Sequence, residues 1–294
     1  MDKITMLGTG HAMTFDCFNT CFVYENENGK MLVDTGGGKQ LLKQLQDAKI
    51  NASEISAVFI SHRHTDHILG LPWLFRTVGG PGGDRTLTLY LHADVMKVAK
   101  GFIELMFPDK MDAIVSAVRF VEVAHGDEAE ILGRKFRFLD LCSPNVPQFG
   151  FSMLLGNGKR LVFHGDVPFN EINRQEFQGT EWLMHEAFHL ESAGHGMPPM
   201  GAGGPPGMPP MGGPGVPPKG PGGPGGKGGP GKMGHSTVKV AAGYAESLGV
   251  KELILFHGTD SDLATRQKDY SEEARQAFSG NIYVPYDLDV IELT

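Results

Sequence analysis

The chain has few cysteines, no long hydrophobic run and no excess of positive charge. Three cysteines among 294 residues cannot build a disulfide framework, which favours a reducing compartment such as the cytoplasm. No run of about 18 apolar residues occurs, so we expect no membrane helix, and the segment 1–7 lacks the apolar core of a signal peptide. The formal net charge of -8 argues against a basic nucleic-acid-binding surface over the whole protein.

One segment, 196–233, consists almost entirely of Gly, Pro, Met and Lys. It has no acidic residue, little that could pack into a core, and no strict Gly-X-Y period that would indicate collagen. We expect a disordered surface insertion. A second interpretation is a flexible arm whose lysines reach a phosphate-rich substrate, because the segment lies directly before His235.

The rest of the sequence alternates short β-rich runs with amphipathic stretches. The spacing of apolar residues predicts helices at 39–48, 94–106 and 237–248. Strands are expected at 4–7, 20–24, 30–33, 57–60, 86–91, 117–123, 135–141, 149–155, 160–163, 182–184, 253–256 and 282–293. Because two sheets would need helices on their outer faces, we predict one α/β domain over 1–294, a sandwich of the αββα kind.

Directly after the apolar run 57–60, the chain carries the pattern H-x-H-x-D-H. Three imidazoles and one carboxylate fall within six residues, namely His62, His64, Asp66 and His67. Imidazole nitrogen and carboxylate oxygen are ligands of Zn²⁺ and similar ions. The alternative is a polar loop that happens to be rich in histidine, but burying four such groups without a metal would be costly. The pattern therefore predicts a metal site.

Two further polar residues follow predicted strands. Asp166 comes after the strand at 160–163, and His257 comes after the strand at 253–256. Loops at strand ends can gather around one site, and a carboxylate can bind two metal ions through its two oxygens. We therefore expect Asp166 to bridge two metals, the first held by His62 and His64 and the second by Asp66, His67 and His257.

These motifs resemble those of the metallo-β-lactamase-fold hydrolases, and most closely the ribonuclease Z branch. The resemblance covers nearly the whole chain apart from the Gly/Pro-rich segment, and it rests on Leu7–Gly10, Ser61–Pro72, Pro147–Phe151, Met184–Ala187, His235–Thr237 and Val284–Asp287. It implies an αββα metallo-β-lactamase sandwich that hydrolyses phosphodiesters with a metal-activated water. It also implies Zn²⁺, two ions per chain, with Mn²⁺ and Fe²⁺ as alternatives. The expected partners are RNA or a small phosphodiester such as a cyclic nucleotide, and a second copy in a homodimer.

The same resemblance assigns roles to three side chains. Glu186 and His235 would form a dyad in which the carboxylate orients the imidazole, and the imidazole protonates the leaving oxygen. Asp66 would orient the nucleophilic water as well as bind metal. Two alternatives stay open: His235 as part of a helix cap beside Ser236, and Glu186 as one half of a buried salt bridge.

The sequence departs from the ribonuclease Z pattern in two places. That branch supplies a third histidine to the first metal shortly before the strand at 149–155, where this chain has none. Cys142 is the candidate replacement, since thiolate binds Zn²⁺ well; His164 is a second candidate, and Cys142 as a packed core residue is the alternative. The branch also carries its tRNA-binding arm where this chain has only residues 151–165.

Two other functions remain open. One is hydrolysis of a thioester, lactone or β-lactam, against which the Glu186–His235 pair argues, since those reactions do not need such an acid. The other is a non-catalytic binding protein with a degraded metal site, which the missing histidine supports.

Overall fold

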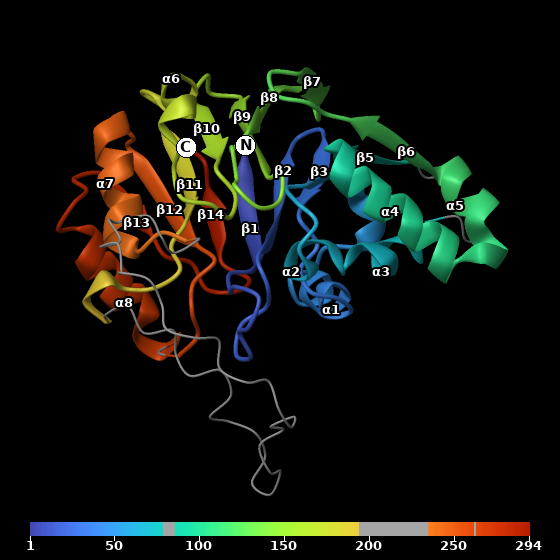
Figure 1. The fold of residues 1–294 in the computed structure, drawn as a ribbon, viewed down its shortest axis with the longest axis horizontal. Coiled ribbons are helices and arrows are strands. Elements are labelled where there is room, and N and C mark those ends of the chain that lie inside the picture. The colour runs from blue at the N-terminus through green and yellow to red at the C-terminus, as the bar shows by residue number, and fades with distance from the viewer. Residues whose placement is uncertain (79–85, 194–234, 262) are drawn as a thin grey trace, which may run out of the picture.

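In the computed structural model, which describes residues 1–78, 86–193, 235–261 and 263–294, two seven-stranded sheets pack face to face (Figure 1). The first has the order β14–β1–β2–β3–β4–β5–β6. The second has the order β13–β12–β11–β10–β9–β8–β7. The strands of the first sheet are β1 (Lys3–Gly8), β2 (Cys21–Asn26), β3 (Gly29–Val33), β4 (Ile55–Ile60), β5 (Leu87–Leu91), β6 (Val118–Glu122) and β14 (Val290–Glu292). Those of the second are β7 (Glu128–Ile131), β8 (Arg134–Asp140), β9 (Phe149–Leu154), β10 (Arg160–Phe163), β11 (Trp182–Glu186), β12 (Glu252–Phe256) and β13 (Asn281–Tyr283).

Helices cover the outer faces of both sheets (Figure 1). The helices on the side of the first sheet are α1 (Gln40–Asp47), α2 (Thr65–Ile68), α3 (Leu71–Phe75), α4 (Ala93–Met106) and α5 (Met111–Ala117). The second carries α6 (Arg174–Phe177), α7 (Val238–Leu248) and α8 (Leu263–Ala274). Short 3-10 turns lie at η1 (Ala52–Glu54), η2 (Pro108–Lys110), η3 (Glu171–Asn173) and η4 (Glu191–Ala193).

The alternation of side chains along a strand explains the layers. On β4, Val58 belongs to the cluster that packs against α1, α3 and α4, whereas its neighbour Phe59 faces the second sheet. Between the sheets lies an aromatic core, in which Phe59 contacts Phe138 and Phe151. On the far side, the small residues of α7 let that helix lie close to the second sheet. The predicted αββα sandwich is confirmed.

Parallel pairing sets where the loops meet. Strands β3 to β6 run parallel in one sheet, and β10 to β13 run parallel in the other. The carboxyl ends of parallel strands share one edge of a sheet, and loops at that edge commonly build binding sites. The edges carrying the ends of β4, β10, β11 and β12 thus hold the polar residues singled out in the sequence.

One prediction about the elements needs correction, and one long helix was not anticipated. The run 282–293 is not one strand: β13 joins the second sheet, and β14 pairs with β1 in the first. The turn at Pro285–Asp289 separates them. Helix α8 was not predicted, because its buried face includes the polar side chains of Arg266 and Glu273, so apolar spacing does not reveal it.

The predicted insertion at 196–233 lies outside the described residues. Among those residues, no helix is long and apolar enough to cross a membrane.

Candidate active site

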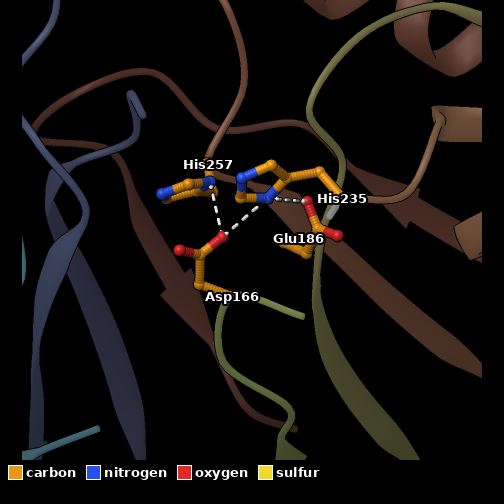
Figure 2. A group of neighbouring side chains, drawn as sticks. All are labelled: Asp166, Glu186, His235 and His257. Carbon is orange, nitrogen blue, oxygen red and sulfur yellow. Dashed lines mark ion pairs between the residues drawn. The ribbon is translucent and has the colours of Figure 1, made fainter. Parts of the chain in front are cut away.

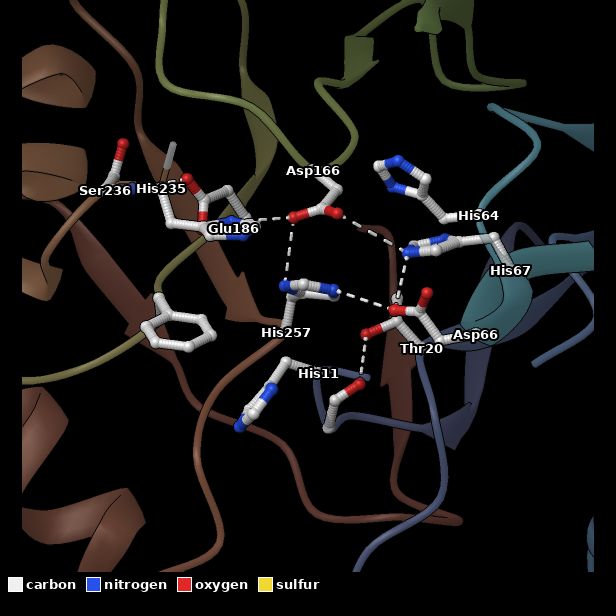
Figure 3. A network of polar contacts seen from close by, with 12 residues as sticks. His11, Thr20, His64, Asp66, His67, Asp166, Glu186, His235, Ser236 and His257 are labelled. Carbon is white, nitrogen blue, oxygen red and sulfur yellow. Dashed lines mark hydrogen bonds and ion pairs between the residues drawn. The ribbon is translucent and has the colours of Figure 1, made fainter. Parts of the chain in front are cut away.

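The candidate site lies where both sheets present the ends of parallel strands. His62 follows β4, and His64 precedes the short helix α2, which carries Asp66 and His67. The loop after β10 supplies Asp166. Further contributions come from Glu186 at the end of β11, His257 directly after β12, and His235 shortly before α7. The structure thus brings residues from distant parts of the sequence to one place (Figure 3).

Asp166 lies at the centre of this group, and its two oxygens face different sides. Its Oδ2 lies 3.8 Å from Nε2 of His62 and 3.6 Å from Nε2 of His67. Its Oδ1 lies 3.0 Å from Nδ1 of His257 and 3.0 Å from Nδ1 of His235 (Figure 2). This placement suits a carboxylate that binds two metal ions.

A second carboxylate, that of Asp66, lies between His67 and His257. Oδ2 of Asp66 lies 3.3 Å from Nε2 of His67 and 3.5 Å from Nε2 of His257 (Figure 3). Ligand atoms about 2.0–2.2 Å from a tetrahedral zinc ion lie roughly 3.3 Å from one another. The separations around Asp66 and Asp166 therefore suit a metal ion between the groups.

Three overlapping sets of described residues have ligand atoms within 4.8 Å of one another. They are His62, His67 and Asp166; Asp66, His67 and His257; and Asp166, Glu186, His235 and His257. Several buried atoms in these sets have no hydrogen-bond partner among the described residues, including Nε2 of His67, both ring nitrogens of His257 and Oδ1 of Asp166. Buried polar atoms left without partners are costly, and metal ions would satisfy them.

Asp34 contacts Ser61 and His67 beside the candidate site, and it was not singled out in the sequence. Its carboxylate accepts hydrogen bonds from the backbone N–H of Ser61 at 2.7 Å and from the Ser61 hydroxyl at 2.8 Å. Its Oδ2 also lies 2.8 Å from Nδ1 of His67. A carboxylate behind a metal-binding histidine fixes its tautomer and ring orientation. The signal in the sequence was an aspartate directly after a buried strand, similar to Asp166, which lies a short way beyond the end of β10.

The charged side chains of the site shift one another's pKa values. Burial would lower the pKa of His67, but the carboxylates of Asp66 and Asp34 raise it well above its usual value. Burial would raise the pKa of Asp66, but His67 and His257 hold it well below the usual range. Burial, together with the nearby His67, lowers the pKa of His62 well below its usual value, so this ring is neutral and able to bind a metal.

Glu186 and His235 come together as the resemblance implied. Oε2 of Glu186 lies 3.4 Å from Nδ1 of His235, and Oε1 accepts a hydrogen bond from the backbone N–H of Ser236 at 2.5 Å. Burial would lower the pKa of His235, but Asp166 and Glu186 raise it to about 10. The alternative role of His235 in a helix cap finds no support, because the side chain of Thr237 caps α7.

Three predicted ligands lie less centrally. His64 is exposed, and its Nδ1 lies 2.9 Å from Nε2 of His62, but it belongs to none of the three sets of described residues. Cys142 has a positive φ of 56° and its thiol contacts the carbonyl of Asp140; it too belongs to none of the sets. His164 is fully buried and stacks on His185 with ring centroids 4.5 Å apart, away from the sets. Ligation by His64 stays a prediction, and for Cys142 both interpretations, metal ligand and packed residue, stay open to measurement.

Known proteins share both the sequence pattern and the fold. The ribonuclease Z of Methanothermobacter thermautotrophicus is 27% identical over 95% of this chain and 92% of its own length. That of Methanosarcina acetivorans is 30% identical, but the match spans 52% of this chain and about half of the relative, 48%. The predicted likeness to ribonuclease Z is confirmed.

Solved structures agree on the fold. The metallo-β-lactamase-fold protein YhfI from Bacillus subtilis superposes with a TM-score of 0.72 at 18% identity, covering 99% of this chain and 98% of that one. The short form of human tRNase Z gives a TM-score of 0.66 at 19% identity, covering 99% of both chains. At these identities the likeness concerns the fold. The sequence profile of the Anti-Pycsar protein Apyc1 family matches residues 2–196, so the chain belongs to that family.

Proposed function

We propose that this chain is a dinuclear, metal-dependent hydrolase of phosphodiesters. The observation that carries the proposal is the position of Asp166, whose two oxygens face separate sets of imidazoles. In the proposed arrangement His62 and His64 hold the first metal, while Asp66, His67 and His257 hold the second. Zinc suits this set of nitrogen and oxygen ligands, and Mn²⁺ and Fe²⁺ are the alternatives.

Two metals at this place would activate a water molecule near neutral pH and offset the charge on the phosphoryl oxygens. The chain's own residues do the remaining work. Asp66 is placed beside both His67 and His257, where its carboxylate can orient the attacking water. His235 holds Nδ1 against Asp166 and Glu186, which leaves Nε2–H to protonate the leaving oxygen. Glu186 keeps that imidazole charged and in place.

A small phosphodiester such as a cyclic nucleotide is the favoured substrate. Strands β9 and β10 are joined by a turn of residues 155–159, closed by a hydrogen bond from the N–H of Leu155 to the carbonyl of Lys159. The resemblance places a tRNA-binding arm in this part of ribonuclease Z, and such a turn has no room for one. The name of the relatives supports a second candidate, cleavage of precursor tRNA as an endoribonuclease.

The assembly and setting are also proposals. We propose a homodimer, since Leu105, Met106, Met111 and Val115 are exposed apolar side chains along α4 and α5, and such surfaces commonly mark interfaces. The free state of all three cysteines suits a reducing cytoplasm. The single domain expected over 1–294 is supported by the core that both sheets share.

A direct comparison of substrates tests the proposed reaction. Purified protein is assayed with bis(4-nitrophenyl) phosphate, a cyclic nucleotide, a precursor tRNA, a thioester and a lactone, before and after metal removal and readdition. We expect metal-dependent hydrolysis of both small phosphodiesters and little of the thioester or lactone. Cleavage of precursor tRNA alone would favour the second candidate. Thioester or lactone hydrolysis without phosphodiester hydrolysis would overturn the proposal, and no turnover of any substrate would favour a binding protein.

A further inference from the structure

The loop between β1 and β2 lies beside the candidate active site and is tightly anchored. Both ends of the loop are held by Asp287, which accepts hydrogen bonds from the backbone N–H of Thr9 at 3.0 Å and from that of Phe18 at 2.6 Å. Its tip is held by Asp260, which accepts from the N–H groups of Phe15 and Asp16. The loop is therefore a fixed part of the site's surroundings.

This loop carries His11 to the edge of the site. The backbone N–H of His11 donates to the carbonyl of Gly258, directly after the proposed ligand His257. The two imidazole rings have centroids 6.3 Å apart, and His11 lies on the side of His257 that faces away from Asp166 (Figure 3). His11 is thus next to the proposed metal ligands but is not one of them.

The hydrogen bonding of His11 fixes which ring atom is free. Its Nδ1 accepts a hydrogen bond from the backbone N–H of Met13 at 3.2 Å. A ring nitrogen that accepts carries no hydrogen, so the hydrogen of the neutral ring lies on Nε2. None of the hydrogen bonds between described residues engages that Nε2–H, and the side chain is only partly buried. It is therefore a donor available to a ligand.

Phe188 connects His11 to the proposed general acid. Its ring stacks on His235 with centroids 4.8 Å apart and an interplanar angle of 14°. Its ring also contacts His11, with centroids 4.5 Å apart at 54°. Because His235 would protonate the leaving oxygen, the departing part of a substrate lies on this side of the site. His11 and Phe188 are the neighbours it would meet there.

We propose that His11, together with Phe188, forms a subsite for a nucleoside on the leaving side of the phosphodiester. The inference rests on the proposed function and deepens it. The Nε2–H of His11 donates a hydrogen bond to an acceptor on the nucleobase, and Phe188 supplies apolar contact. His11 is then a residue that determines specificity for the base of the substrate.

Two substitutions separate the two ring nitrogens of His11. His11→Asn keeps an acceptor close to Nδ1, so the contact with Met13 persists, but it removes the outward donor. His11→Gln places an amide N–H close to Nε2 and retains that donor. Met13→Ala is the matched control, because it changes an exposed side chain of the same loop and leaves the backbone N–H in place.

The substrates are a 3′,5′-cyclic nucleotide and its abasic analogue, which share the phosphodiester and differ in the base. The ratio of kcat/KM for the two substrates measures what the base contributes. We expect wild-type protein to favour the nucleotide, and His11→Asn to lower the ratio about fivefold to tenfold, as loss of one hydrogen bond would. His11→Gln should restore most of the ratio, and Met13→Ala should match wild type.

The outcomes distinguish this inference from the proposed function. If wild-type protein hydrolyses both substrates at the same kcat/KM, the nucleoside subsite does not exist, although the phosphodiesterase proposal stands. Equal ratios for His11→Asn and wild type would likewise overturn the role of His11. If wild-type protein hydrolyses neither cyclic substrate nor bis(4-nitrophenyl) phosphate, the proposed function itself fails.

Discussion

His67 and Asp34 form a buried pair in which Nδ1 of the imidazole lies 2.8 Å from Oδ2 of the carboxylate. This contact directs Nε2 of His67 toward Asp66 and Asp166, where the proposed metals are held. The proposed metal centre therefore depends on Asp34, whose two carboxylate oxygens are engaged by Ser61 and His67.

The first prediction concerns Asp34→Asn. Asparagine tolerates the positive φ of 57° at this position, so the backbone should be kept. Its NH2 group replaces one carboxylate oxygen and cannot accept a hydrogen bond, so either the bond from the Ser61 backbone N–H or those from the Ser61 hydroxyl and His67 are lost, together with the negative charge. We expect metal affinity to fall about 10- to 100-fold, the usual effect of losing such a partner. Competition with a chromogenic chelator measures it, and unchanged affinity would show that Asp34 has no part in the metal centre.

The second prediction separates acid catalysis from metal binding. His235→Ala should slow hydrolysis of a diester with an alkoxide leaving group by about 10²–10⁴-fold. With 4-nitrophenolate, which leaves without protonation, the loss should be much smaller. The hydrolysis rates of wild-type protein and His235→Ala are compared for the two esters at equal metal content. Equal losses on both esters would mean that His235 is not the general acid.

The third prediction concerns pH and the metal-free protein. Asp166 and Glu186 raise the pKa of folded His235 to about 10, whereas the ordinary value is 6.5. Between these values the folded state binds more protons than the unfolded state, so stability falls as pH rises. The contribution is fully present below pH 6.5 and is lost as pH passes through about 10. The free energy of unfolding of wild-type protein in chelator should thus fall over this range more than that of His235→Gln; parallel curves would contradict the assignment.

The sequence allowed the fold and much of the site to be anticipated, for physical reasons that can be named. The run 57–60 has the apolar character of a buried strand, and the motif after it fixes where His62 and His67 lie. Glu186 and His235 are 49 positions apart, and only their likeness to known motifs connected them. Asp34 was missed because a single aspartate after a strand has no distinctive spacing.

Contacts between distant segments account for the remaining differences. Helix α8 buries the guanidinium of Arg266 against Thr9 and the carbonyl of Pro285, partners that no local pattern reveals. The strand-like run at the end of the chain divides between the sheets because β1 offers one edge and β12 the other. These pairings depend on tertiary structure rather than on propensity.

The fourth prediction settles the place of Cys142. The sequence suggested that its thiolate completes the first metal site, and the structure gives this no support, since none of the metal-capable sets of described residues includes it. Burial, followed by the charge of Asp140, raises the pKa of its thiol, which disfavours the thiolate. We therefore expect Cys142→Ala to keep two metals per chain by elemental analysis. Loss of one equivalent would restore Cys142 as a ligand.

The central claim is that Asp166 joins two metal ions in one catalytic centre. The most direct measurement is the metal content of wild-type protein and of Asp166→Ala, determined by elemental analysis beside the rate of phosphodiester hydrolysis. We predict two metals per wild-type chain, and loss of both metals and of nearly all activity in the variant. Full metal content in Asp166→Ala, or activity in wild-type protein that carries no metal, would contradict the claim.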